Sequence, residues 1–268
     1  MSGGLDLLRS RVTLRDRSVA DVMDLALRFV VVHGRAYALV ALGSLVPVAA
    51  LSLLAGWKLG WGVSWAISIP LAIVAEIPFT VLASRLVFQE RVRARDVLRA
   101  AAVEVPRILF GRLLSAVLIA FGFFALLIPS FFLAAISLFA GEVMLLERAS
   151  MVQAFGRSQR IAWSAMSDVV LALIVLGLVP VASVFITDIA GRSLIGEVLQ
   201  FRPPPPVWND YGSALAMLGL FVQVPYLTTA RFLLYLNIRT REEGWDIQTR
   251  FAAIAAHAHD EAENTKAA

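Results

Sequence analysis

The chain has 268 residues, of which 59% are hydrophobic and 16% are charged, and its formal net charge is +4. Soluble domains carry about 25% charged residues, so this composition, with a mean hydropathy of +0.77, excludes an ordinary soluble domain and predicts a membrane protein. The sequence contains no cysteine, which excludes disulfides, thiolate metal sites, cysteine nucleophiles and palmitoylation.

The N-terminal region predicts a helix at the membrane surface. It contains no apolar run long enough for a cleaved signal peptide, so the first span is expected to act as the targeting signal. Residues 1–17 are expected to form a flexible leader, and Ser18 and Asp21 then form an S-x-x-D capping box. One helical face is apolar and consists of Val19, Val22, Met23, Ala26 and Val30. This helix is expected to lead into a first span at about residues 36–55.

The second span, at about residues 65–88, contains a carboxylate and two prolines. Pro70 and Pro78 are expected to kink it. A charge at the bilayer centre costs at least about 2.5 to 3.5 kcal/mol, so Glu76 should face protein, water or a partner. Two interpretations stay open. Glu76 is either a coupling or substrate site beside the kink, or a buried neutral carboxyl bonded to a free backbone carbonyl.

A basic segment separates the second and third spans. Its arginines include Arg91, Arg93, Arg95 and Arg99. Asp96 can cap a second surface helix here. Spans three and four, at about residues 108–127 and 130–146, are expected to form a tight hairpin around Pro129.

Ser150 and Gln153 form another capping box, which begins a mixed apolar and basic helix carrying Arg157 and Arg160. A fifth span is expected at about residues 165–186.

The remaining chain predicts a non-cytoplasmic loop and one more span. Residues 190–210 are polar enough to leave the membrane, and their four consecutive prolines predict polyproline structure. The sixth span is expected at about residues 211–236. The membrane domain would therefore cover residues 18–245, followed by an amphipathic helix and polar tail at 246–268.

Two stretches of the sequence repeat. Residues 76–88, EIPFTVLASRLVF, and 223–235, QVPYLTTARFLLY, share the spacing of a polar residue, a proline, an alanine and two aromatic residues, and a looser copy begins at Pro129. With six spans, 21 of the 24 basic residues fall on one side, which predicts that both termini are cytoplasmic. The expected fold is an all-α integral membrane protein. Its six transmembrane helices form three repeats of a cytoplasmic amphipathic helix plus a helical hairpin.

Two segments resemble one bacterial family. The first contains Ile128-Pro129, Glu147-Arg148 and Ala154-Phe155-x-Arg157-Ser158. The second contains Leu234-Tyr235-Leu236-x-x-Arg239 and Arg241-Glu242-x-Gly244-Trp245-Asp246. Over most of residues 20–255 the chain is similar to the glycerophosphodiester phosphodiesterase membrane domain and to YciC-like membrane proteins, with departures at Ser130 and Asn237. The resemblance implies a helical protein of the bacterial inner membrane without the phosphodiesterase barrel, and it implies no particular activity.

The residues contain no catalytic motif, so we expect no enzyme, cofactor or metal site. His257 and His259 lie in the polar tail, where a solvated chain end is the simpler interpretation. Asp168 and Asp188 lie near opposite ends of the fifth span, about 30 Å apart at helical rise, and cannot form an aspartate dyad. No nucleic-acid partner is needed to explain the arginines.

Two function classes stay open. The first is a non-enzymatic subunit or scaffold whose surface helices contact anionic lipid, a partner protein or a second copy. Its candidate contact residues are Arg91, Arg93, Arg95, Arg99, Arg157 and Arg160. These arginines could also serve only to orient the spans.

The second class is a transporter of a small solute or lipid. Its candidate polar residues are Glu76, Gln223, Arg85, Glu142 and Arg231. The last three lie nearer the cytoplasmic face, where snorkelling or a structural ion pair is the alternative. A water-accessible cavity reaching Glu76 favours the transporter, and a packed bundle around a neutral Glu76 favours the scaffold.

Overall fold

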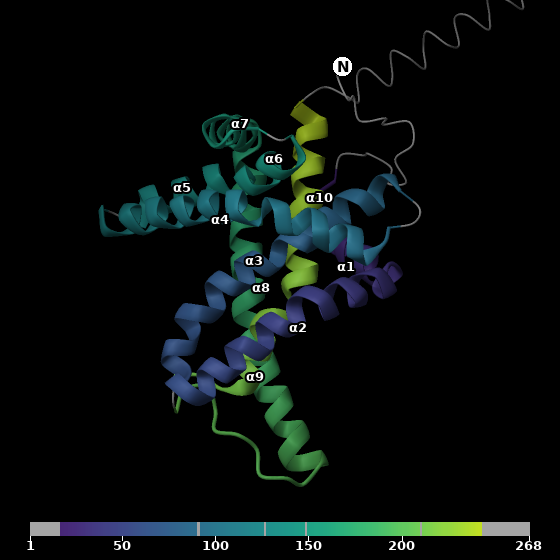
Figure 1. Ribbon diagram of the computed structural model, residues 1–268. Coiled ribbons are helices and arrows are strands. Elements are labelled where there is room, and N and C mark those ends of the chain that lie inside the picture. Colours follow the sequence, from purple (N-terminus) through teal and green to yellow (C-terminus); the bar gives the residue numbers. More distant parts are fainter. Residues whose placement is uncertain (1–16, 90–91, 126, 148, 210, 243–268) are drawn as a thin grey trace, which may run out of the picture.

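The computed structural model describes residues 17–89, 92–125, 127–147, 149–209 and 211–242, and these ranges contain helices and no strand. In chain order the elements are α1 (Val19–Val32), α2 (Gly34–Leu59), α3 (Trp61–Phe88), α4 (Ala94–Ala125), α5 (Leu127–Ser137), α6 (Ala140–Leu146), α7 (Met151–Ser164), α8 (Met166–Ser193), the π-helical turn η2 (Leu194–Val198), α9 (Ala214–Val222) and α10 (Val224–Glu242). Figure 1 shows their arrangement.

Four stretches are long and apolar enough to cross a membrane: Gly34–Leu59, Trp61–Phe88, Met166–Val198 and Ala214–Arg241. Their most apolar windows differ in burial. Those of Trp61–Phe88 and Ala214–Arg241 are 61% and 67% buried, against 17% and 22% for the other two. The first pair therefore forms the core, while α2 and α8 present apolar side chains outward, as lipid contact requires.

The core helices pack through small residues and short turns. Gly60, at a positive φ of 92°, joins α2 to α3. A Cβ added at Gly219 would lie 2.6 Å from the carbonyl oxygen of Ser183, so glycine lets α9 approach the α8 backbone. Ser183 Oγ also donates to the Gly219 carbonyl at 2.8 Å. Such close backbone contact is typical of helix pairs in membranes.

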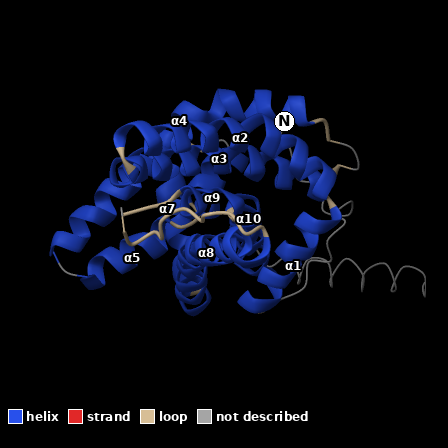
Figure 2. Cartoon of the chain, turned by 90° about the horizontal axis from the view of Figure 1, so that it is seen from below, coloured by secondary structure: helices blue, strands red, loops and turns tan. Residues whose placement is uncertain are grey.

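The α4–α5 hairpin lies across the direction of α8 and α10. Figures 1 and 2 show α8 and α10 running in a common direction, with α4 and α5 crossing that direction side by side. Among the described residues, the structure thus supports four crossing helices and does not confirm the expected spans at 108–127 and 130–146. The first of these is the end of α4, which continues through Pro106 from the surface segment, and the second is divided between α5 and α6.

Two details of the predicted helices differ in the structure. Asp96 lies in the first turn of α4, which begins at Ala94, and is not its cap. The apolar helical stretch that contains the predicted fifth span reaches Val198, beyond the expected end at residue 186.

The pseudo-equivalence of Pro78 and Pro225 is not confirmed. The α3 helix continues through Pro78, whereas α9 ends before Gln223 and α10 begins at Val224. Pro225 is therefore in the first turn of a new helix, where its missing N–H leaves no hydrogen bond unmade.

The α1 helix packs on the protein as well as bearing charges outward. Its predicted capping box is present, with the Asp21 N–H donating to Ser18 Oγ at 3.2 Å. The expected apolar face is buried, with Phe29 as a further member and Val30 only half-buried, and it lies against α10.

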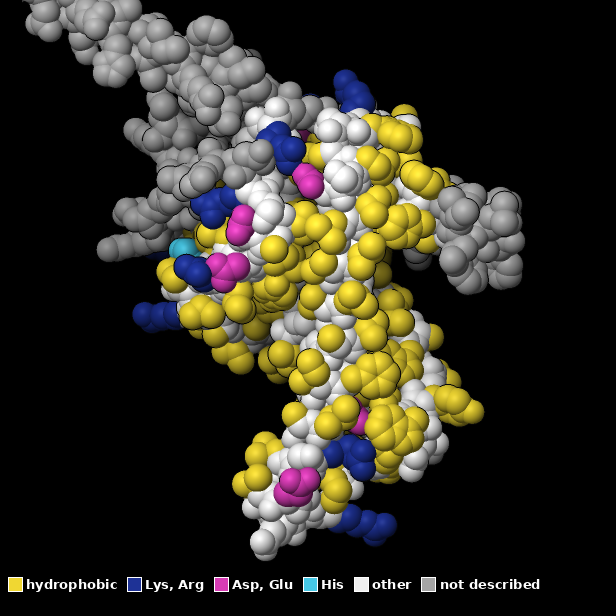
Figure 3. Space-filling view, turned by 180° about the vertical axis from the view of Figure 1, so that it is seen from behind, with side chains coloured by type: hydrophobic (Ala, Val, Ile, Leu, Met, Phe, Trp, Pro, Cys, Tyr) yellow, Lys and Arg dark blue, Asp and Glu magenta, His cyan; other side chains and the backbone are white. Residues whose placement is uncertain are grey.

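On the face drawn in Figure 3, charged side chains gather in the upper part and at the lower end, and apolar ones lie between them.

The end of the molecule opposite α7 is closed by polar contacts. Trp65 Nε1 donates to the Tyr211 carbonyl at 2.7 Å, which joins α3 to the start of the last membrane stretch. Asp188, fully buried on α8, accepts from the Ser213 hydroxyl and from the Val207 N–H. These bonds tie Val207 and Ser213 to α8 and give Asp188 a structural role.

Candidate functional site

Four charged side chains from four helices meet inside the helical bundle. They are Glu76 on α3, Arg112 on α4, Glu142 on α6 and Arg231 on α10. Arg112 Nη1 donates to Glu76 Oε2, and Arg231 Nη2 lies 2.8 Å from the same oxygen. Arg231 Nε donates to Glu142 Oε1. The formal charges cancel, as a low-dielectric interior requires.

The burial of these groups decreases from Glu142 toward Arg112. The Glu142 side chain is 1% exposed, those of Glu76 and Arg231 are 10% and 11% exposed, and that of Arg112 is 18% exposed. Glu142 therefore pairs with Arg231 on the buried side of the cluster, while Glu76 and Arg112 face open space on the other side. The expected alternative of a carboxyl bonded to a free backbone carbonyl is not found, because the Glu76 carboxylate contacts two guanidinium groups.

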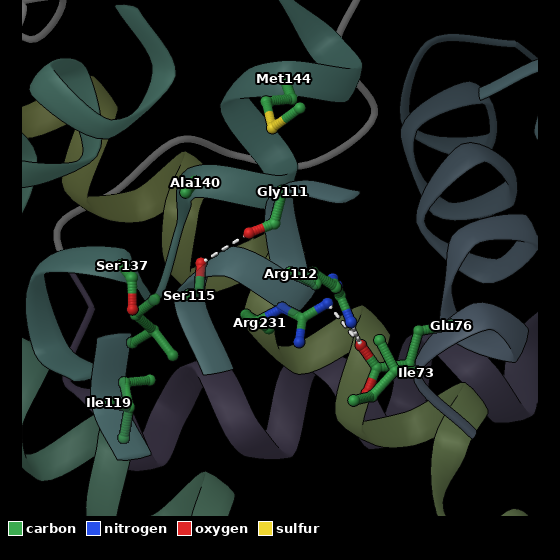
Figure 4. A pocket seen from close by; sticks show the side chains of 12 residues that line it. Ile73, Glu76, Gly111, Arg112, Ser115, Ile119, Ser137, Ala140, Met144 and Arg231 are labelled. Atoms are coloured by element: carbon green, nitrogen blue, oxygen red, sulfur yellow. Dashed lines mark hydrogen bonds and ion pairs between the residues drawn. The ribbon is translucent and has the colours of Figure 1, made fainter. Parts of the chain in front are cut away.

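That open space is a cavity of about 250 Å³ between α3, α4, α5, α6 and α10. Figure 4 shows Arg112 and Arg231 converging on Glu76 at one side. Hydroxyl groups and apolar side chains complete the lining, which includes Ser115, Ser137, Ile73, Ile119 and Met144. The cavity thus combines a charged wall with a mostly apolar surround, as small-ligand sites commonly do.

The two guanidinium groups have more donors than acceptors to receive them. Each carries about five N–H donors, yet within the described part of the chain Glu76 is the only recorded partner of Arg112. Arg231 Nη2 is buried and, although close to Glu76, makes no well-directed hydrogen bond. Buried N–H donors without an acceptor are energetically costly. These guanidinium groups can therefore donate hydrogen bonds to oxygen atoms of water or of an anion.

Two glycines lie close to Arg112 where α4 and α6 approach each other. A Cβ at Gly141 would lie 3.4 Å from Arg112 Nε and Nη2, so the guanidinium lies directly against the α6 backbone. A Cβ at Gly111 would lie 2.9 Å from Met144 Sδ, so α4 also approaches α6 closely at the neighbouring residue. A side chain at Gly141 would lie beside the arginine at the limit of ordinary van der Waals contact, whereas one at Gly111 would meet the flexible end of Met144.

A second polar cluster surrounds Glu147, just after α6. Tyr235 Oη donates to Glu147 Oε1 at 2.5 Å, and Arg239 Nη1 lies 3.2 Å from that oxygen. Arg157 Nε lies 2.9 Å from Glu147 Oε2. These residues come from two distant segments of the chain. Glu147 and Arg157 border a cavity of about 500 Å³ on the α7 side that Arg160 also lines.

The two clusters are neighbours along the same helices. On α10, Arg231, Tyr235 and Arg239 follow at intervals of four residues, which places them on one helical face. Glu142 on α6 pairs with Arg231, and Glu147, just after α6, pairs with Arg239. A line of paired charges therefore extends from the interior cavity toward α7.

The other predicted site residues do not join the inner cluster. Gln223 is buried and its Nε2 donates to the Leu220 carbonyl at 3.0 Å, and it does not line the cavity. Arg85 is half-buried near the end of α3, and in the described structure no ion pair links it to the cluster. Arg112 is not among the site residues that the sequence predicts. Its position inside the apolar run 108–125 was the available signal.

The surface arginines follow the expected pattern in part. Exposed side chains include Arg93, Arg95, Arg99 and Arg160. Arg157 is half-buried and ion-paired with Glu147. Arg91 and the C-terminal residues 246–268 lie outside the described residues.

Comparisons with family models, with curated proteins and with solved structures give no match to this chain. Its function therefore has to be argued from the geometry of the interior cavity and of the charged cluster beside it.

Proposed function

We propose that this protein is a membrane transporter that binds a small anionic group, carried by a solute or by a lipid head group, in the cavity beside Glu76. The observation that carries the proposal is the pair of guanidinium groups, Arg112 and Arg231, with unused donors at the wall of a half-open cavity between the helices. Guanidinium groups match the oxygens of carboxylate, sulfate and phosphate groups.

The size of the cavity agrees with a small ligand. A volume of 250 Å³ corresponds to roughly eight water molecules at about 30 Å³ each. It can hold one oxyanion group with several waters, or a head-group phosphate whose attached chains leave between the helices. The apolar lining from Ile73 and Ile119 limits the polar part of the ligand to the arginine side.

The finer topology belongs to the same proposal. We place the protein in a bacterial inner membrane, with both termini in the cytoplasm, because 21 of the 24 basic residues lie in segments assigned to that side. Four spans, or six if the α4–α5 hairpin also crosses, both return the C-terminus to the side of the N-terminus. The family resemblance, carried partly by Glu147, Tyr235 and Arg239, supports the same location.

The binding test uses purified protein in nanodiscs of phosphatidylcholine, titrated with methanesulfonate, sulfate and inorganic phosphate by calorimetry. Arg112→Gln should weaken binding by about 10- to 100-fold, since a hydrogen bond to a charged group contributes about 1.5 to 3 kcal/mol. Arg99→Gln changes an exposed arginine on the same helix and should leave binding unchanged. Absence of binding to the wild type, or equal loss in both variants, would contradict the proposal.

A second arm distinguishes a head group from a free anion. Protein in nanodiscs that contain phosphatidylglycerol is examined by native mass spectrometry. A lipid ligand predicts retained phosphatidylglycerol in the wild type, its loss in Arg112→Gln, and weaker methanesulfonate binding in these nanodiscs. A free anionic solute predicts the same methanesulfonate affinity in both lipid compositions.

The scaffold remains a second candidate because the cavity of about 500 Å³ at α7 is lined by Arg157 and Arg160, and Arg160 is exposed. It predicts that Arg160→Gln reduces binding of the protein to a lipid or partner that co-purifies with it, while methanesulfonate binding at the inner cavity stays unchanged.

A further inference from the structure

We infer that anion binding in the inner cavity is coupled to protonation of Glu76, so that the carboxylate occupies the arginines when the cavity is empty and takes up a proton when an external anion replaces it. This inference rests on the proposed function and adds the coupling ion. Glu76 would act as an internal competitor for the ligand.

The geometry places the competition on one atom. Arg112 and Arg231 both contact Oε2 of Glu76, and this carboxylate lines the same cavity that an external anion would enter. A ligand oxygen that pairs with both guanidinium groups at the point where they meet would therefore take the position of Oε2. The helices that carry the two arginines do not have to move for this exchange.

The charges favour loss of the carboxylate charge during the exchange. With the cavity empty, two guanidinium groups face the two carboxylates Glu76 and Glu142. A monovalent anion adds a third negative charge that no described cation at the cavity offsets. An uncompensated charge in a low-dielectric interior is costly, and one proton on a carboxylate restores neutrality.

The structure also indicates which carboxylate takes the proton. Glu142 is 1% exposed, does not line the cavity and remains paired with Arg231 Nε. Glu76 lines the cavity and loses its partners to the ligand. Protonation of Glu76 therefore follows directly from ligand entry, whereas protonation of Glu142 would break the ion pair between Glu142 and Arg231.

The remaining groups around Glu76 do not supply another proton site. From α4 it faces Arg112 and from α10 it faces Arg231, which bridges to Glu142 on α6. On α2, the Tyr37 hydroxyl is bonded to Thr229 Oγ1 at 2.7 Å. The α9 helix contains no titratable residue.

The sign of the effect follows from linkage. If the bound state holds one more proton than the empty state, the affinity for the anion rises as the pH falls, by about tenfold per pH unit in the range where Glu76 is charged when empty and protonated when occupied. Glutamine at position 76 imitates the protonated state. The Glu76→Gln variant should therefore bind at least as tightly as the wild type at low pH and show no such slope.

The experiment titrates the protein in phosphatidylcholine nanodiscs with methanesulfonate, whose own charge is constant between pH 5 and 8. Calorimetry at one pH in two buffers of different ionisation enthalpy counts the protons taken up. The expected result is about one proton per anion for the wild type and none for Glu76→Gln. Glu76→Asp, which keeps a carboxyl group, should retain the uptake.

The outcomes are distinguishable. Methanesulfonate binding without proton uptake in the wild type overturns the coupling and leaves the binding site intact. Persistence of the pH slope in a folded Glu76→Gln protein overturns the assignment to Glu76. Absence of binding at every pH in both proteins overturns the proposed function itself. The wild-type proton count needs no variant, so it decides the question even if Glu76→Gln does not fold.

Discussion

Replacing Glu76 with glutamine removes the charge that two buried arginines contact, while keeping the size of the side chain. Breaking a buried ion pair costs about 3 to 5 kcal/mol. The side chains of Glu76 and Arg112 are 10% and 18% exposed, and the glutamine carbonyl still accepts one hydrogen bond, so we expect a smaller loss of about 2 to 3 kcal/mol. The sequence alone left open a neutral carboxyl, for which the same substitution would be nearly silent.

The assay is thermal unfolding in phosphatidylcholine nanodiscs, followed by the fluorescence of the six tryptophans. The loss predicts an apparent Tm lower by about 4 to 12 °C. Because methanesulfonate can take the place of the missing carboxylate, millimolar concentrations should restore more of the apparent Tm in Glu76→Gln than in the wild type. Glu104→Gln is the matched control, since Glu104 forms only a half-exposed pair with Arg107 at 3.8 Å and should change stability by less than about 1 kcal/mol.

An unchanged apparent Tm in a well-folded Glu76→Gln protein would refute the ion-paired Glu76. A lowered Tm that methanesulfonate does not restore would keep the ion pair and refute the anion-binding role of the arginines. A double-mutant cycle with Arg112→Gln then measures the pair directly, and the two effects should be non-additive because the residues share one contact.

Three further substitutions test contacts outside the inner cavity. Gly219→Ala should destabilise the protein by more than about 1 kcal/mol in thermal unfolding, because its Cβ would overlap the α8 backbone, whereas Gly177→Ala, where nothing lies within 4 Å, should not. Tyr235→Phe should cost about 1 to 2 kcal/mol by removing the hydrogen bond to Glu147, with an unchanged Tm as the contrary result. Asp188→Asn should increase proteolysis of the 199–213 loop, and equal cleavage rates would show that this carboxylate does not hold the loop.

Much of the local structure could be predicted from the sequence. Apolar length predicts the four crossing stretches, because a helix in lipid must satisfy its own backbone. The capping box at Ser18 predicts the start of α1, and the isolated charge of Glu76 identifies the interior polar site. Each of these features is determined by residues that lie close together in the sequence, so the sequence pattern alone can predict it.

The partners of Glu76 could not be predicted in the same way. Arg112 and Arg231 lie 36 and 155 positions farther along the chain, and only the packing of α3 against α4 and α10 brings them together. The direction of the α4–α5 hairpin likewise depends on tertiary contacts. The sequence repeat predicts that Gln223 is the counterpart of Glu76. In the structure Gln223 lies just before α10, and its side chain donates to the Leu220 carbonyl instead.

The convergence around Glu147 is an intermediate case. The resemblance to a family singled out Glu147, Tyr235 and Arg239 as motif residues in separate segments. It did not say that they contact one another. The structure shows a hydroxyl and a guanidinium group at the same carboxylate oxygen, an arrangement that only the packing of α10 beside the end of α6 brings about.

Anomalous diffraction at the selenium edge from crystals of the protein soaked in selenate tests the central claim most directly, because selenate is an oxyanion that can be located by its own signal. The account predicts an anomalous peak in the cavity beside Glu76, within hydrogen-bond distance of both Arg112 and Arg231, and its loss in Arg112→Gln crystals. A cavity without a peak, with selenate found only at exposed arginines of the surface, would contradict the account.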